Sequence, residues 1–309
     1  MKVLVTGGGG FIGEAVVRAL LARGDSVVTF DVQFPARWTG HANLVTVRAD
    51  ITDMAAVAQI VMTHRPQAVV HTAAIVGVLS SIASPLSLVR VNIEGSLNVF
   101  EAMRLGSIKR CVHISSEETY GHFRTDPVTE DHPLDAVYPY GISKATVEQL
   151  GRTYRDVHGL EVLNVRTCSV YGPGLPRDRV PKNVVEAALA GRALHIPSGG
   201  DMAIDHTYID DTVSGTLAIL DQPAHRFDAY NIASGHTVTL GKILAIVREL
   251  IPSAQISIGP GWGRHGDQID MVRKGALDVS RAANEMGWRP RYDIRAGLAA
   301  YIEAMKRKD

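Results

Sequence analysis

The sequence predicts an α/β protein whose core is a parallel β-sheet covered by helices on both faces. Short apolar runs alternate with segments of helical periodicity from the N-terminus to about residue 166. The apolar runs are hydrophobic along their whole length, which is typical of strands buried on both faces. The alternation breaks up after residue 170, so we expect a smaller lobe in the later part.

The expected elements follow from these patterns in chain order. In the first part we expect strands at 2–6, 26–30, 43–47, 68–71, 110–114 and 161–166, and helices at 11–23, 54–64, 85–105 and 138–158. In the later part we expect helices at 183–190, 208–220 (beginning as a strand), 238–250, 280–286 and 294–306, with irregular chain at 193–205 and a Gly-rich loop at 259–270. This divides the chain into a first domain, 1–170, and a smaller lobe, 171–309, partly interleaved with it.

The composition excludes several classes of protein. Of 309 residues, 46% are hydrophobic, and 32 basic residues balance 32 acidic ones. This balance gives no basic patch for nucleic acid and no polybasic membrane signal. The two cysteines lie in apolar runs, as buried thiols of a reducing compartment do, and no apolar run reaches transmembrane length. We therefore expect a cytoplasmic protein, with no metal site because no His/Cys/Asp cluster has ligand spacing.

A glycine-rich turn follows the first expected strand. Gly7, Gly10 and Gly13 lie between that strand and the first helix, and Asp31 ends the second strand. Such glycines allow a tight turn, close approach of a pyrophosphate and close helix packing, while the acidic residue binds ribose hydroxyls. The pattern predicts a dinucleotide site that favours NAD over NADP, although Arg37 could meet a 2′-phosphate.

Two further segments carry candidate catalytic groups. Tyr140 and Lys144 are spaced to share one face of a helix, where an ammonium would lower the pKa of a phenol that takes a proton from an alcohol. The segment SSEETYG, residues 115–121, places Glu117 and Glu118 directly after a strand. These carboxylates are either solvated loop residues or an acid/base pair at an active-site edge.

Together these motifs resemble the extended short-chain dehydrogenase/reductase family, and most closely its NAD-dependent epimerase/dehydratase branch, which acts on nucleotide sugars. The resemblance covers essentially the whole chain and implies a Rossmann-like fold with a C-terminal substrate-binding lobe. It implies that NAD contacts Gly7, Gly10, Phe11, Ile12, Gly13, Asp31, Asp50, Ile51, Thr72, Ala73, Ala74, Asn92, Tyr140 and Lys144. It also implies a homodimer formed through helices 85–105 and 138–158.

The resemblance implies roles at the substrate end of the site as well. Ser116 matches the family's catalytic Ser or Thr, Glu118 its proton-abstracting glutamate, and Glu117 a position where hexose dehydratases carry an aspartic acid. Ser169 and Ile204 depart from the Asn and Arg that commonly hold the diphosphate. Arg264 matches a second family arginine, and Arg177, Arg179 and Lys182 are candidate replacements, so Arg177 and Arg264 are expected to bind substrate.

These observations predict an NAD-dependent epimerase or dehydratase that works through transient oxidation of a sugar hydroxyl. Two alternatives stay open. The first is a dehydrogenase of a small sugar, sugar acid or polyol without a nucleotide, which Ser169 and Ile204 favour. The second is a non-catalytic NAD-binding regulatory protein, against which Ser116, Tyr140 and Lys144 argue.

Overall fold

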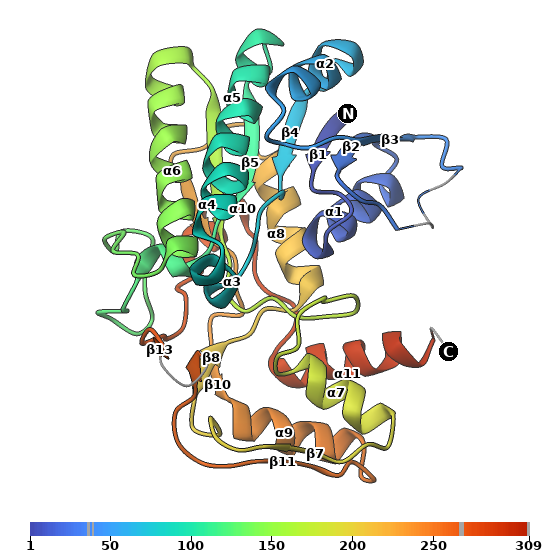
Figure 1. The fold of residues 1–309 in the computed structure, drawn as a ribbon, viewed down its shortest axis with the longest axis vertical. Coiled ribbons are helices and arrows are strands. Elements are labelled where there is room, and N and C mark those ends of the chain that lie inside the picture. Colours follow the sequence, from blue (N-terminus) through green and yellow to red (C-terminus); the bar gives the residue numbers. More distant parts are fainter. Residues whose placement is uncertain (36–37, 39, 266–268, 308–309) are drawn as a thin grey trace.

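The computed structural model describes residues 1–35, 38, 40–265 and 269–307. It consists of a larger half built on one sheet and a smaller half of helices and short strands (Figure 1). The sheet contains β1 (Lys2–Thr6), β2 (Ser26–Asp31), β3 (Leu44–Arg48), β4 (Ala68–His71), β5 (Arg110–Ile114), β6 (Glu161–Arg166) and β9 (Ala229–Asn231). The predicted α/β fold class is confirmed.

The sheet order is β3-β2-β1-β4-β5-β6-β9, and every neighbouring pair is parallel. The strand order reverses between β1 and β4, so the loops that follow these strands diverge. A crevice at this switch point, outside the carboxyl ends of the strands, is where such sheets bind ligands.

Helices cover both faces of the sheet, as the continuous hydrophobicity of the strands requires. One face carries α1 (Phe11–Ala22), α8 (Ile209–Asp221) and α10 (Ser280–Met286); the other carries α2 (Met54–His64), α5 (Gly95–Leu105) and α6 (Pro139–His158) (Figure 1). Two large hydrophobic clusters fill the two interfaces, and the first extends into the smaller half.

The smaller half contains α7 (Lys182–Leu189), α9 (Leu240–Leu250), α11 (Ile294–Lys306), and the strand pairs β7 (Leu194–Ile196) with β11 (Ile256–Ile258), β8 (Ala203–Asp205) with β10 (Thr237–Thr239), and β12 (Arg264–His265) with β13 (Ile269–Asp270). The chain leaves the main sheet after β6, returns as α8 and β9, and leaves again. The boundary at residues 170 and 171 stays a prediction. No helix in the described part of the chain is both long and apolar enough to cross a bilayer.

The structure differs from the sequence-based elements in several places. The expected helix at 85–105 is α4 (Pro85–Val89), a π-helical turn (Arg90–Glu94) and α5, preceded by an unexpected helix α3 (Val78–Ala83). The expected irregular chain at 193–205 contains β7 and β8, and the loop at 259–270 contains β12 and β13. Residue 208 begins no strand; it caps α8, although it forms an isolated bridge with Tyr171.

Candidate active site

A cleft of about 1450 Å³ lies outside the carboxyl ends of the strands, between the two halves. The segments that follow β1, β2, β4, β5 and β6 line one side of it, and chain from the smaller half lines the other. Nearly all the predicted cofactor and catalytic residues meet here, although they are spread over the first half of the sequence. Among the described residues, no group of His, Cys, Asp and Glu could hold a metal ion.

The glycine turn forms a tight cradle at one end of the cleft. A Cβ built at Gly13 would lie 2.1 Å from the carbonyl oxygen of Gly7, and one at Gly9 would lie 2.0 Å from that of Gln33. At Gly10 the nearest atom to a Cβ is 3.2 Å away, so this glycine faces more open space. This is the shape expected where a diphosphate approaches the backbone at the N-terminus of α1.

The ribose-binding candidate lies at the edge of this cradle. Asp31 Oδ2 accepts a hydrogen bond from the Gly9 amide at 3.0 Å, which fixes the carboxylate beside the cleft. A carboxylate here accepts hydrogen bonds from ribose hydroxyls and repels a 2′-phosphate. The chain therefore has the groups that NAD requires at this end of the site. Arg37 lies outside the described residues.

The other predicted cofactor residues divide into two groups. The residues that line the cleft are Phe11, Ile12, Asp50, Ile51, Thr72, Ala73 and Ala74. Asn92 is not among them: its side chain accepts a hydrogen bond from Ile75 N at 2.8 Å and donates to Ser143 Oγ at 3.0 Å. Asn92 lies in the π-helical turn, a distortion frequent at functional sites, and it ties the segment after β4 to α6.

Ser116 and Tyr140 meet in the middle of the cleft. Ser116 follows β5 and Tyr140 lies in the first turn of α6; their side chains are hydrogen-bonded and both are nearly buried. Burial raises the pKa of Tyr140 to about 12, while the Arg177 charge and the Ser116 hydrogen bond act to lower it. The Lys144 ammonium, which was expected to lower this pKa, donates a hydrogen bond to the Ile114 carbonyl oxygen.

Lys144 lies one turn along α6 and lines the cleft. Its ammonium donates to the carbonyl oxygen of Ile114 at 2.6 Å and contacts His113 Nε2 at 3.3 Å, while His113 Nδ1 lies 2.9 Å from Asn164 Oδ1. Burial lowers the pKa of Lys144 to about 7, and the nearby charge of Glu148 opposes this shift. His113 and Ile114 thus hold the lysine in place beneath the cofactor end of the cleft.

The two adjacent glutamates lie in a 3₁₀ turn (Glu117–Tyr120) that Ser116 caps through the Glu118 amide, at 3.2 Å. Both line the cleft, and Glu117 is buried. Lys274 reaches them from the smaller half, with its Nζ 3.0 Å from Glu118 Oε1 and 3.7 Å from Glu117 Oε1. Burial raises the pKa of Glu117, and the Lys274 charge opposes this effect. The interpretation of these residues as a solvated loop is wrong for Glu117.

The substrate-facing residues of the smaller half are mixed in character. Ser169 Oγ accepts a hydrogen bond from Arg179 at 2.6 Å, and Ile204 is buried in β8; both line the cleft. Arg177 also lines the cleft. Its guanidinium packs against Gly77, so closely that a Cβ added to this glycine would lie 2.6 Å from Arg177 Nη1. The side chain of Arg264 lies outside the described residues.

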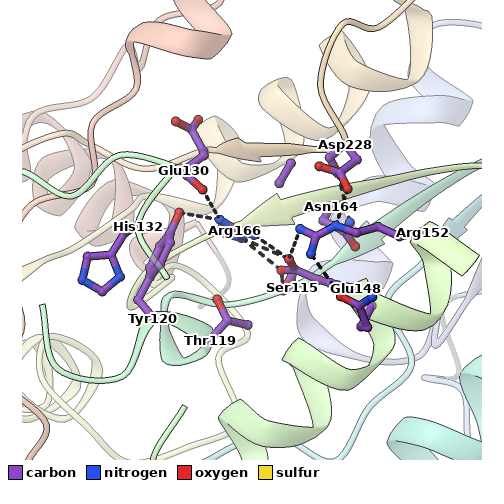
Figure 2. A network of polar contacts seen from close by, with 12 residues as sticks. Ser115, Thr119, Tyr120, Glu130, His132, Glu148, Arg152, Asn164, Arg166 and Asp228 are labelled. Atoms are coloured by element: carbon purple, nitrogen blue, oxygen red, sulfur yellow. Dashed lines mark hydrogen bonds and ion pairs between the residues drawn. The ribbon is translucent and has the colours of Figure 1, made fainter. Parts of the chain in front are cut away.

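A buried ion pair contacts the segment that begins at Ser115. Arg166, at the end of β6, binds Glu148 of α6 (Figure 2). The guanidinium Nη2 is 2.6 Å from Glu148 Oε2, and the group also donates to Tyr120 Oη and Glu130 O, each at 3.0 Å. Ser115 completes the cluster by donating to Glu148 Oε1 at 2.5 Å. Every charged group in it is paired.

Sequence reasoning did not find Lys274, the histidine under Lys144, or the Arg166–Glu148 pair. The need for a partner of Arg166 could have been predicted. An arginine at the end of a buried strand is rarely buried unless an acidic residue pairs with it. Lys274 has no motif of its own, and its position depends on how the smaller half folds over the sheet.

Comparison with known proteins gives one family. The model of the NAD-dependent epimerase/dehydratase family matches residues 3–233. UDP-glucose 4-epimerase of Mycolicibacterium smegmatis is 30% identical, with 100% of this chain and 99% of that protein covered. dTDP-glucose 4,6-dehydratase 1 of Escherichia coli is 31% identical, with 98% and 92% covered.

A solved structure gives the same answer. The UDP-glucose 4-epimerase of Thermotoga maritima, in complex with UDP-glucose, superposes with a TM-score of 0.90 at 28% identity, and 100% of this chain and 99% of that chain are covered. The chain belongs to the NAD-dependent epimerase/dehydratase family and is an enzyme of that family.

Proposed function

We propose that this enzyme is a nucleotide-sugar 4,6-dehydratase that works through transient oxidation of the sugar. Its relatives include epimerases and dehydratases at nearly equal identity, so overall similarity does not separate the two reactions. The observation that carries the proposal is the position of Glu117 and Glu118, which line the cleft directly beside Ser116. Dehydration needs a further base at C5 and a further acid at C6, whereas epimerisation at C4 needs only the group that takes the hydroxyl proton.

In this reaction the residues that line the cleft have separate roles. When bound, NAD supplies a hydride acceptor that later returns the hydride to the sugar. Tyr140 takes the proton of the C4 hydroxyl, and Ser116 binds the same oxygen. Glu118 removes the C5 proton that the new ketone acidifies, and Glu117 protonates the C6 hydroxyl, which leaves as water. The returned hydride adds at C6, and Glu118 gives the proton back to C5. Lys144 binds the hydroxyls of the nicotinamide ribose and so orients the nicotinamide next to the reacting carbon.

The test is a panel of UDP-, GDP- and dTDP-sugars beside free sugars and uronic acids, with product mass and NADH absorbance followed together. We expect a product one water lighter than a nucleotide sugar, with no lasting NADH. Tyr140→Phe should lower turnover about 10²–10⁴-fold, the usual contribution of a positioned acid or base. Tyr154→Phe, in the same helix but hydrogen-bonded to Glu101, is the matched control and should keep full activity.

A second candidate is a dehydrogenase of a substrate without a nucleotide, which the apolar Ile204 on the cleft wall favours. Stoichiometric NADH from a free sugar or sugar acid would support it and would contradict the dehydratase. A product isomeric with its nucleotide-sugar substrate would instead establish an epimerase. Unchanged turnover in Tyr140→Phe would contradict all three.

We also propose that the enzyme is a homodimer formed through α4, α5 and α6. Support comes from apolar side chains that lie exposed on α4 and α6, with Leu86 81%, Val89 46% and Ile142 47% exposed. Burial of such side chains against a second copy is favourable. Light scattering should give twice the chain mass, and Leu86→Glu should give the mass of one chain; a wild-type monomer would contradict the proposal.

A further inference from the structure

Lys274 occupies a fixed position at the substrate end of the cleft. Its neighbour Arg273 accepts a hydrogen bond from Phe123 N at 3.0 Å, and Ala276 N donates to Asp126 Oδ1 at 2.8 Å. The intervening glycine packs so tightly that a Cβ there would lie 2.7 Å from the Asp126 carboxylate. The backbone on both sides of Lys274 is therefore tied to the segment that follows the catalytic turn.

The ammonium of Lys274 faces two carboxylates. Its Nζ lies 3.0 Å from Glu118 Oε1 and 3.7 Å from Glu117 Oε1, and 5.7 Å from the centre of the Phe123 ring. The side chains of Lys274 and Glu117 are 6% and 7% exposed, and that of Glu118 is 16% exposed. One cation balances one carboxylate, and two close carboxyl groups with a single counter-charge retain a proton between them.

Two further buried groups act on the pair, one acidic and one basic, so the carboxyl groups still outnumber the cations by one. Asp205 of β8 acts on Glu117 and accepts hydrogen bonds from Ser234 N and Oγ, Gly235 N and Leu277 N. The Arg179 charge acts on both glutamates while its guanidinium donates to Ser169, and Arg177 acts on Tyr140 of α6. The buried Cys168 is hydrogen-bonded to Glu117, and burial keeps it a thiol by raising its pKa.

We infer that Lys274 is a positioning residue that gives the two adjacent glutamates different protonation states, with Glu118 held as a carboxylate and Glu117 left as a carboxylic acid. Glu118 is closer to the ammonium and more exposed to water, so its charge is better stabilised. Glu117 Oε2 is buried without a hydrogen-bond partner, a costly state for an ionised oxygen. The inference rests on the proposed function, because it assigns the base and the acid of that reaction.

Infrared spectroscopy tests this without any substrate. At neutral pH the wild-type protein should show a carboxylic-acid C=O band that is lost in Glu117→Gln. Glu118→Gln leaves Glu117 as the one carboxyl group of the pair facing Lys274, so the acid band should weaken in that variant as well. The S–H band of Cys168, assigned by Cys168→Ser, should shift in Glu117→Gln because its hydrogen-bond partner changes. If Glu117→Gln and the wild type show the same acid band, the inference is overturned.

Variants of Lys274 test the cause. Lys274→Gln should add a second acid band that disappears when Glu118→Gln is combined with it, whereas Lys274→Arg should keep the wild-type pattern. Lys242→Gln, at an exposed position on α9, is the matched control and should change nothing. An unaltered spectrum in folded Lys274→Gln would contradict the inference. If Lys274→Gln does not fold, the loss of the wild-type acid band in Glu117→Gln still decides.

Kinetics give an independent reading once a substrate is known. The acid limb of the kcat/KM profile should move to higher pH in Lys274→Gln, because an adjacent opposite charge is lost, and Lys274→Arg should restore it. An unmoved acid limb would contradict the inference. If no nucleotide sugar is dehydrated, the proposed function fails, but the infrared result stands by itself.

Discussion

Two buried clusters of charged residues begin two positions apart in the chain and differ in how completely their polar atoms are paired. Ser115 belongs to the cluster of Arg166 and Glu148, in which the guanidinium and both carboxylate oxygens have partners (Figure 2). Glu117, two residues later, belongs to the cluster of Glu118 and Lys274, where Glu117 Oε2 is buried without a hydrogen-bond partner.

The difference indicates what each cluster does. A fully paired buried cluster costs little in the folded state and holds β5, β6 and α6 in register behind the cleft. A cluster with an unpaired buried oxygen is destabilising by itself, and such groups in a native structure call for a functional explanation. We therefore assign the first cluster to the fold and the second to the reaction.

The largest effect is expected in the paired cluster. Glu148→Ala leaves the Arg166 guanidinium buried without its counter-ion, which typically costs about 3–5 kcal/mol of unfolding free energy. Urea unfolding followed by circular dichroism measures this loss. Glu148→Met combined with Arg166→Met removes both charges and should recover most of the stability.

Replacing Ser115, an uncharged partner of Glu148, gives a reference for the stability loss in Glu148→Ala. Ser115→Ala removes a hydrogen bond to Glu148 while the ion pair remains, so the expected loss is about 1 kcal/mol. If Glu148→Ala costs no more than Ser115→Ala, the pairing of Arg166 is not what stabilises this region, and the contrast between the two clusters fails.

The two clusters also differ in how far the sequence predicts them. The Gly7–Gly13 turn, Asp31, and the Tyr140/Lys144 spacing are local patterns, so their elements and their place at the sheet edge could be predicted. β4, β5 and β6 were predicted with their observed bounds for the same reason, since each is a short run centred on valine and other apolar residues. The identification of the family from these motifs is confirmed.

What could not be predicted depends on contacts between distant segments. β7 to β11 have three residues each, too short for any periodicity to show, and β9 joins the main sheet only through its pairing with β6. Lys274 meets Glu118 because Arg273 and Ala276 bind the chain at 122–128, and no spacing in the sequence records that contact.

The smallest change in unfolding free energy is expected for Glu117→Gln. The direction in which this change depends on pH distinguishes the two clusters. Burial raises the folded-state pKa of Glu117 above its ordinary value of 4.5, so the folded protein keeps a proton that the unfolded chain loses. This contribution to stability is fully present below pH 4.5 and is lost as the pH rises through the folded-state pKa. The uncharged amide has the same shape and does not titrate.

The unfolding free energy of the wild type should therefore fall, relative to Glu117→Gln, as the pH is raised from 4.5. Glu130, whose pKa burial also raises, is present in both proteins, so its contribution cancels in the difference. The change should be smaller than for Glu148→Ala, because the amide creates neither a cavity nor an unpaired charge. Parallel stability curves for the two proteins would show that Glu117 is ionised in the folded state, and the unpaired oxygen would then need another explanation.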